Sequence, residues 1–351
     1  MISMRRKILR PKSSLTMKPG SLPGFLFHGE NMKRVMIVDA FNQFIRGYIV
    51  DPSKNPNGQP IGGMRTFVNI LNKITREVKP DLIVVVWDGK GGSQKRRAMN
   101  KNYKAGRKPL RTNWSTDEMT PQDTDNNKLW QQLRVVEYLN HTPIIQFMEA
   151  EVEADDVISY VKSNSMFADW QKVIVSADKD FIQLLDDKTI LHRPIQKEYL
   201  NKKSIVEKFN IHPNNFALAR AMVGDPSDNL PGVPRVGLGT VAKRFPFLKE
   251  EKTFYLSDIV EECTKPENKQ KIFSSIVEQQ ELIKFNYEMM QLSSPLLSIQ
   301  SKARIDETFE EYEPHYNQTE VRKLMISDGV LTVNMQDLEQ RFNNIITSFS
   351  R

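Results

Sequence analysis

The chain has 351 residues, of which 39% are hydrophobic, and a formal net charge of +7. This is enough for one large or two ordinary globular domains, and no run of eighteen apolar residues suggests a membrane span. The N-terminus lacks the apolar stretch of a secretory signal, so we expect a cytoplasmic protein. The single Cys263 excludes an internal disulfide and a multi-cysteine zinc site, and the five histidines are scattered.

Basic charge is concentrated in two segments. Residues 1–34 carry a net charge of +7, and residues 89–111 contain nine basic residues and no acid, so the rest of the chain is acidic. Such concentration is typical of a protein that binds a polyanion such as nucleic acid. Two solvated, flexible basic segments would have the same composition, and charge alone does not choose between these interpretations.

The pattern along the chain predicts a disordered extension followed by an α/β domain. Residues 1–31 mix Pro, Gly, Ser and basic residues without periodicity. Short apolar runs then alternate with helical patterns, which favours a mostly parallel sheet that binds ligands beyond the carboxyl ends of its strands. The predicted strands are 35–40, 82–89, 143–147 and 173–180, and the predicted helices are 64–78 and 128–139.

Aspartates stand at the ends of three of these strands, at Asp39, Asp88 and Asp178 with Asp180. Aspartate is also common at strand ends because it caps turns and helices, so each position alone has a structural explanation. The coincidence of three is harder to explain in that way. We therefore expect the carboxylates to gather at one edge of the sheet.

The stretch EVEADDVISY, residues 151–160, adds Glu153, Asp155 and Asp156 at the first turn of a predicted helix. The helix dipole offsets only part of their repulsion. Together with Asp225 and Asp228, nine carboxylates would share one cleft, and oxygen ligands without His or Cys suit Mg²⁺ or Mn²⁺. Two such ions can activate water and neutralise the leaving oxygen of a phosphodiester, which predicts metal-dependent phosphoryl hydrolysis.

Other acid-rich or phosphate-binding sites fit less well. The segment SADKDFIQLL does not continue as an EF-hand loop, no G-x-x-x-x-G-K-[ST] occurs, and no G-x-G-x-x-G follows the first strand. The segment NLPGVPRVGLGTVAK, residues 229–243, contains Gly232 and Gly237 and can enter a helix through Thr240. Such a hairpin can hold a DNA backbone through its amides, although it could equally be an ordinary turn.

Six motifs in order resemble the structure-specific 5′ nucleases, which include the 5′ nuclease domain of DNA polymerase I, flap endonucleases, and bacteriophage 5′ to 3′ exonucleases also called RNase H. They are VDAFNQFIRGY, VVVWDGKG, YKAGRKP, EVEADDVI, VSADKDFIQLL and VGDPSDNLPGVPRVG. The resemblance implies a PIN-like α/β core with a helical arch and a C-terminal helical region containing a helix-hairpin-helix. The implied division is 1–31 basic extension, 32–200 nuclease core with the arch at about 89–127, 201–263 helix-hairpin-helix region, and 264–351 C-terminal helical region.

The resemblance also implies roles for individual residues. Lys104 and Arg107 would stabilise charge on the scissile phosphate, and Tyr103 would stack on a base. Arg96 and Arg97 would contact phosphates, while Gly232, Val233, Gly237 and Thr240 would hold the duplex at the helix-hairpin-helix, where K⁺ is expected. The first Mg²⁺ would be bound by Asp39, Asp88, Glu153, Asp155, Asp156 and Asp178, and Asp178 would also have a catalytic role. The second Mg²⁺ would be bound by Asp180, Asp225 and Asp228. Mn²⁺ could substitute for these ions.

The implied function is a Mg²⁺-dependent 5′ to 3′ exonuclease and flap endonuclease that cleaves DNA and RNA–DNA hybrids, removing RNA primers during replication. The expected substrates are 5′ flaps and single-stranded 5′ ends, and the expected form is a monomer without membrane contact, in the host cytoplasm if phage-encoded. A single-strand-binding protein or clamp is an expected partner. Two alternatives stay open: a DNA-junction binding protein that does not cut, against which the full acid set argues, and a PIN-type ribonuclease, against which the hairpin and the basic arch argue.

Overall fold

A computed structural model describes residues 32–107, 111–114, 119–330 and 333–349. The predicted extension at 1–31 therefore lies outside the described residues, as do residues 108–110 and 115–118 of the predicted arch. None of the helices in the described ranges is long and apolar enough to cross a membrane.

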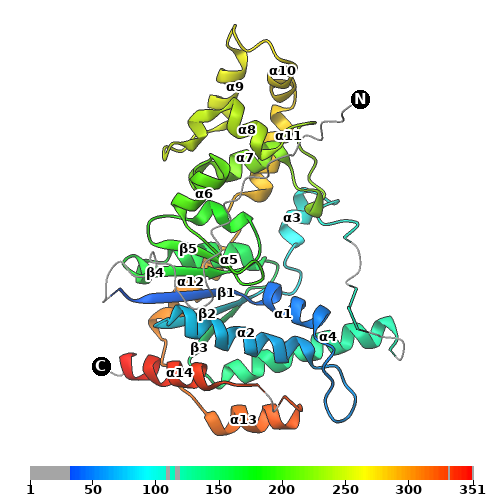
Figure 1. The fold of residues 1–351 in the computed structure, drawn as a ribbon, viewed down its shortest axis with the longest axis vertical. Helices are drawn as coiled ribbons and strands as arrows, with labels where there is room; N and C mark the ends of the chain where they lie inside the picture. Colours follow the sequence, from blue (N-terminus) through cyan, green and yellow to red (C-terminus); the bar gives the residue numbers. More distant parts are fainter. Residues whose placement is uncertain (1–31, 108–110, 115–118, 331–332, 350–351) are drawn as a thin grey trace, which may run out of the picture.

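A six-stranded sheet in the order β3-β2-β1-β4-β5-β6 forms the centre of the molecule (Figure 1). All neighbouring pairs are parallel except β5 with β6, which are antiparallel. Strand β2 is buried at every position, as expected for a strand covered on both faces. The strands are β1 (Arg34–Asp39), β2 (Leu82–Trp87), β3 (Ile144–Met148), β4 (Gln171–Val175), β5 (Thr189–Arg193) and β6 (Glu198–Leu200).

Alternating residues of the strands contribute their side chains to two separate hydrophobic cores, one on each face of the sheet. In β1, Met36 and Val38 belong to the core under α1 (Ala40–Val50), α2 (Gly62–Val78) and α4 (Pro121–Asn140). Val35 and Ile37 belong to the core on the other face, with α5 (Ala154–Ser163). This period of two is what a strand with two covered faces requires. Helix α4 begins earlier than the sequence predicted, because Thr120 and Asp123 form a capping box.

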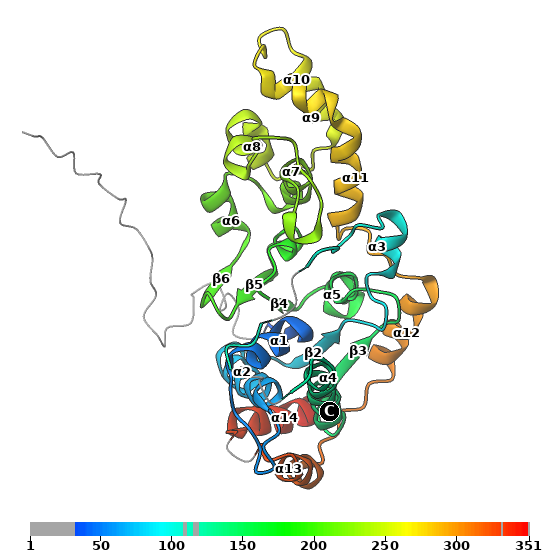
Figure 2. The same cartoon turned by 90° about the vertical axis from the view of Figure 1, so that its right-hand side faces the viewer.

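A lobe of helices extends from the sheet along the long axis of the molecule. Asn286 of α11 donates from Nδ2 to the Ala221 carbonyl oxygen at 3.0 Å and to the Pro231 carbonyl oxygen at 2.8 Å. This amide ties α11, which returns toward the sheet, to α7 and to the hairpin after it (Figure 2). The helices of this lobe are α6 (Lys202–Phe209), α7 (Phe216–Val223), α8 (Leu238–Arg244), α9 (Leu256–Thr264), α10 (Lys271–Glu278) and α11 (Gln280–Met290).

The last helices return to the core. In α12 (Ile299–Glu310), Asp306 accepts a 2.7 Å hydrogen bond from the Tyr160 hydroxyl of α5. Helices α13 (Gln318–Ser327) and α14 (Gln336–Phe349) pack below the sheet against α4 and α2. Residues 264–351, grouped as one region from the sequence, are thus divided between the lobe and the core.

The predicted α/β class, with a mostly parallel sheet and a C-terminal helical region, is confirmed. Strands β5 and β6 were not predicted, because TILHR and EYL are short and carry polar or charged residues. Within the predicted arch, the structure places the short helix α3 (Gln94–Met99), followed by turns to Gly106. Residues 121–127 of the predicted arch belong to α4 instead.

Candidate active site

Three adjacent parallel strands, β2, β1 and β4, bring their carboxyl ends to one edge of the sheet. Asp39 ends β1 and caps α1, accepting a 3.2 Å hydrogen bond from the Asn42 amide and a 2.7 Å hydrogen bond from the Ser176 hydroxyl. Asp178 follows β4, and its Oδ1 accepts from the Asp180 amide at 2.9 Å. Among the described residues, every hydrogen-bond donor to these two carboxylates is neutral.

The turn after β2 packs against the start of α5 and places that helix at the same edge of the sheet. Asp88 Oδ1 accepts a 2.9 Å hydrogen bond from the Ala154 amide at the first turn of α5. A Cβ at Gly89 would lie 1.6 Å from the Glu149 carbonyl oxygen, so only glycine allows this close backbone approach. The packing places the acids at 153–156 beside those of the strands.

Glu153, the N-cap residue of α5, is held by positive and hydroxyl groups from the basic segment. Its carboxylate pairs with Lys104 and, at 2.9 Å, with Arg96, and it accepts a 2.5 Å hydrogen bond from Ser93. Burial alone would raise the pKa of Glu153, but Lys104 and Arg96 hold it below its usual value. This carboxylate is therefore neutralised from within the chain.

Asp156 and Arg96 form a buried pair. The Arg96 guanidinium lies 2.5 Å and 3.3 Å from the two Asp156 oxygens and donates to the Met289 carbonyl oxygen at 3.0 Å. The Leu296 amide donates to Asp156 Oδ1 at 2.9 Å, and Arg96 is only 4% exposed. In this structure, Arg96 ties α3 to α5 and α11, and it would have to leave these partners to reach a phosphate. Arg97, by contrast, is exposed.

Tyr103 is also buried, at 4% exposure, and its hydroxyl lies 3.2 Å from Glu153 Oε2 and 3.1 Å from Asp228 Oδ2. Burial and the Glu153 and Asp228 charges raise the pKa of the phenol, so it remains a proton donor at neutral pH. The ring faces are not free for a base in this arrangement. Tyr103 instead connects the two halves of the acidic cleft.

The second half of the cleft lies between η3 (Asp180–Leu184), α7 and η5 (Pro226–Asp228). Arg220 of α7 donates from Nε to Asp180 at 3.2 Å and from Nη2 to Asp225 at 2.5 Å. Arg107 pairs with Asp228 at 2.5 Å, although its side chain is 54% exposed. These contacts bring the acids of the fifth and sixth sequence motifs together with Arg107 of the basic segment.

Three carboxylates of the cleft, those of Asp39, Asp155 and Asp180, have raised pKa values. Burial, together with the Asp88 and Asp178 charges, raises the pKa of Asp39 to about 7. The same effects, from burial and then the Asp178 and Asp39 charges, raise the pKa of Asp155 well above its usual range. Burial and the Asp178 charge raise the pKa of Asp180 to about 7 despite Arg220. A cation would remove this penalty, so the donor set fits a divalent ion with oxygen ligands.

The cleft encloses only about 50 Å³ of free space, because basic side chains fill it. Across the described ranges, no group of three acidic, histidine or cysteine side chains has the arrangement of a ready metal site. Lys104 pairs with Glu153, Arg107 pairs with Asp228, and Arg220 bridges Asp180 and Asp225, so the cleft carries counter-ions from the chain itself. The cavity is lined by Arg96, Tyr103, Lys104, Arg107, Glu153, Asp155, Asp178, Asp180, Asp225, Ser227, Asp228, Met289, Met290 and Leu292.

The sequence did not single out Arg220, Ser93 or Ser176. Arg220 lies five residues before Asp225, and its 3.2 Å contact to Asp180 spans forty residues, so no local pattern marks it. Ser93 and Ser176 are short polar residues in turn or strand-end positions, where such residues are common. Only the folded arrangement shows that they hold Glu153 and Asp39.

The hairpin after α7 packs tightly against its own base. A Cβ at Gly232 would lie 1.9 Å from the Val223 carbonyl oxygen, and the Val233 amide donates to the Met222 carbonyl oxygen at 2.9 Å. The Val233 amide is thus already used. A Cβ at Gly237 would meet nothing within 4 Å, and the Thr240 amide donates to the Gly237 carbonyl oxygen at 2.8 Å at the start of α8.

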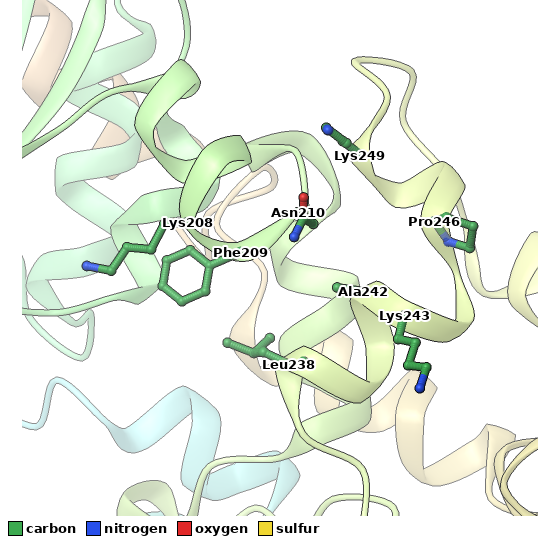
Figure 3. Close-up of a pocket in the computed structure, with 9 residues that line it drawn as sticks. Lys208, Phe209, Asn210, Leu238, Ala242, Lys243, Pro246 and Lys249 are labelled. Atoms are coloured by element: carbon green, nitrogen blue, oxygen red, sulfur yellow. The ribbon is translucent and has the colours of Figure 1, made fainter. Parts of the chain in front are cut away.

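A lysine-bordered groove of about 380 Å³ lies beside the hairpin, between the end of α6, α8 and η6 (Pro246–Lys249). Figure 3 shows Lys208, Lys243 and Lys249 around an apolar floor that includes Phe209 and Leu238. Among the described residues, neither Lys243 nor Lys249 has an acidic partner, whereas Lys208 pairs with Glu198 at 2.6 Å. The groove is therefore positively charged.

Comparison with known proteins identifies the family of this fold and site. The family described as "5′-3′ exonuclease, N-terminal resolvase-like domain" matches residues 34–210, half of the chain. The chain belongs to the 5′-3′ exonuclease family. A 5′-3′ exonuclease of Buchnera aphidicola is 31% identical over 228 residues, which cover 62% of this chain and 72% of that protein. Relatives that carry the name 5′-3′ exonuclease are nucleases, and this protein is an enzyme of the same class.

Other relatives extend the comparison. The thermostable DNA polymerase I of Thermus aquaticus is 31% identical over 228 residues, 64% of this chain but only 24% of the polymerase. The solved structure of the T5 D15 protein, co-crystallised with metal ions, superimposes with a TM-score of 0.59 at 19% identity over 90% of this chain and 99% of that chain. At this identity the superposition shows the fold alone, and it agrees with the predicted α/β fold class.

Proposed function

We propose that this 5′-3′ exonuclease family member is a Mg²⁺-dependent 5′ to 3′ exonuclease and flap endonuclease. The observation that carries the proposal is the convergence of acids from α5, η3, η5 and the end of β4 on one small cleft bordered by Lys104 and Arg107. Asp39 and Asp88, at the ends of β1 and β2, lie close enough to interact electrostatically with these acids. A protein that only binds junctions gains nothing from carboxylates that face a phosphate. The T5 D15 flap endonuclease, similar in fold, has been crystallised with DNA and metal ions, which supports the same reading.

We propose that the residues divide their roles as follows. Asp39, Asp88, Asp155 and Asp178 would bind one Mg²⁺, with Glu153 and Asp156 near it, and Asp180, Asp225 and Asp228 would bind a second. Mn²⁺ is expected to substitute, because it accepts the same oxygen ligands. When bound, the ions supply electrophilic stabilisation to the phosphodiester and its leaving oxygen.

The basic residues would handle the substrate. Lys104 and Arg107 reach the cleft from the segment after β2, and each holds a carboxylate that a cation could take over. Once released, their charges could bind the scissile phosphate and stabilise its transition state. Asp39, buried beside Ser176, would stay fixed at the end of β1 during this exchange.

Duplex DNA would lie along the hairpin and the lysine-bordered groove, with Gly237 and Thr240 nearest the backbone. The open surroundings of Gly237 and the positive charge of the groove support this placement. A K⁺ ion at the hairpin, action on RNA–DNA hybrids, primer removal during replication, a monomeric state, and recruitment by a single-strand-binding protein or clamp are further parts of the proposal. They rest on the family resemblance alone.

The test offers labelled 5′-flap, nicked-duplex and RNA–DNA substrates to the protein with Mg²⁺ or with EDTA. The proposal expects cleavage with Mg²⁺, none with EDTA, and none by an Asp178→Asn variant that still binds the flap. Binding without cleavage by the parent protein would favour the junction-binding alternative. Cleavage of single-stranded RNA in preference to every DNA substrate would favour the PIN-type ribonuclease.

A further inference from the structure

Arg220 is a charged residue of the cleft that no sequence motif assigned. Its guanidinium bridges two acids, with Nε 3.2 Å from Asp180 Oδ1 and Nη2 2.5 Å from Asp225 Oδ2. The side chains of all three residues are less than one fifth exposed. Within the described ranges, Asp180 and Asp225 have no other basic partner.

We infer that Arg220 is a positioning residue that neutralises Asp180 and Asp225 and competes with the second cation for them. The inference rests on the proposed function, because it assigns these acids to a cation. It makes Arg220 the determinant of how tightly that cation binds. The arginine would move away as the ion enters and return as it leaves.

The remaining contacts of the two acids determine what the loss of Arg220 would do. Asp225 Oδ1 accepts from the Ser227 amide at 2.8 Å and from the Ser227 hydroxyl at 2.7 Å, and the Asp225 backbone is paired with Leu230. Asp180 is fixed by its position at the start of η3. Both acids should therefore stay in place without Arg220. The main change would be the loss of one positive charge, which makes the net charge of the cleft more negative by one.

An alternative role for Arg220 is direct contact with a substrate phosphate. Two of the guanidinium nitrogens already donate to carboxylates, one to Asp180 and one to Asp225, so this role would also require release. The two roles differ in what is measured. A phosphate contact would change the KM for the substrate and leave cation affinity in the absence of DNA unaltered.

The experiment measures Mn²⁺ binding to the full chain without DNA, by electron paramagnetic resonance and calorimetry at one pH. We expect Arg220→Met to bind Mn²⁺ about tenfold more tightly at its weaker site, because an adjacent positive charge is lost. Arg220→Lys should stay near the parent protein. Arg322→Met, which removes the same charge from a surface pair with Glu339, is the matched control and should have no effect.

Thermal unfolding gives a second readout. In EDTA the Arg220→Met protein should unfold at a lower temperature than the parent, and Mn²⁺ should raise its midpoint by more. If that variant does not fold, Arg220→Gln replaces it. Unchanged or weaker Mn²⁺ binding in the neutral variants, or a raised KM with parental Mn²⁺ affinity, would overturn the inference.

An Asp178→Asn variant separates this inference from the proposed function. If Asp178→Asn binds Mn²⁺ as tightly as the parent, or the parent binds none, the proposed metal site fails whatever Arg220 does. If Asp178→Asn loses binding while Arg220→Met shows parental affinity, only the role of Arg220 fails.

Discussion

The acids of the cleft fall into two groups that share a residue type and differ in electrostatics. Asp39 and Asp155 have no basic partner among the described residues, and their pKa values are raised by burial and by neighbouring carboxylates. Glu153 and Asp225 pair with lysine or arginine. Despite burial, Lys104 and Arg96 hold the pKa of Glu153 below its usual range, and the Ser227 hydroxyl together with Arg220 does the same for Asp225. The first group requires an external cation, whereas the second carries internal counter-ions that a cation must displace.

The largest expected effect comes from the first group. Asp155→Asn should lower the cleavage rate of a 5′-flap substrate at least about a thousandfold, because a ligand of the proposed ions is lost. The same variant should unfold at a higher temperature than the parent in EDTA, because repulsion with Asp178 and Asp39 disappears. Asp169→Asn, at a position whose side chain is 97% exposed, is the control. If Asp155→Asn cleaves the substrate as fast as the parent, or unfolds at a lower temperature than the parent in EDTA, the two groups of acids do not differ in the way described.

In the second group, loss of a counter-ion should lower the stability of the protein, whereas loss of a carboxylate from the first group should raise it. Arg96→Met should lower the free energy of unfolding by about 3 kcal/mol, because Glu153 and Asp156 would be left buried without their shared partner. Urea titrations in EDTA measure this value. Arg97→Met, at the neighbouring exposed position, should stay within about 0.5 kcal/mol of the parent. If Arg96→Met is as stable as the parent but binds DNA more weakly, Arg96 contacts a phosphate instead of holding the fold together.

A third substitution tests whether an internal counter-ion also serves the reaction. Lys104→Met should lower kcat about a hundredfold and change KM little, because its charge is needed most where negative charge develops on the phosphate. Lys101→Met, three residues away and exposed, is the matched control. Single-turnover and steady-state kinetics on a flap substrate separate the two parameters. Equal losses in kcat and in duplex affinity would reduce Lys104 to a simple phosphate contact.

The smallest expected effect extends the comparison to the hairpin. Gly232→Ala should cost about 2 kcal/mol of stability, because its Cβ would meet the Val223 carbonyl oxygen. Gly237→Ala has open space and should cost about 0.5 kcal/mol or less, while weakening duplex binding if the DNA passes there. Unfolding and salt-dependent binding titrations measure both. A Gly237→Ala protein with parental DNA affinity would place the duplex elsewhere.

Much of the framework was predictable from the sequence. The runs before Asp39 and Asp88 are continuous and apolar, so they predicted buried parallel strands, and strand ends of parallel sheets meet at one edge. The apolar stripe of α5 likewise placed Glu153 and Asp155 at a helix start. These features depend on local periodicity, which a sequence displays directly.

The pairing of charges was not predictable in the same way. The family resemblance implied that Arg96 contacts phosphates, yet it is buried between Asp156 and the carbonyl oxygen of Met289, a residue almost two hundred positions away. Tyr103 was expected to stack on a base, and it lies buried between Glu153 and Asp228. Which cation meets which acid depends on long-range packing, and a single sequence contains no local signal for it.

The position of α14 has a consequence for how the chain is assembled. Leu338, Phe342 and Ile345 complete the core under α2, and the Leu338 amide donates to Asn72 across a separation of 266 residues. During synthesis, this face of α2 therefore stays uncovered until α14, made 266 residues after Asn72, has left the ribosome. Closing such a long loop is slow, so we expect the early strands and helices to persist as a partly folded intermediate with an exposed apolar face.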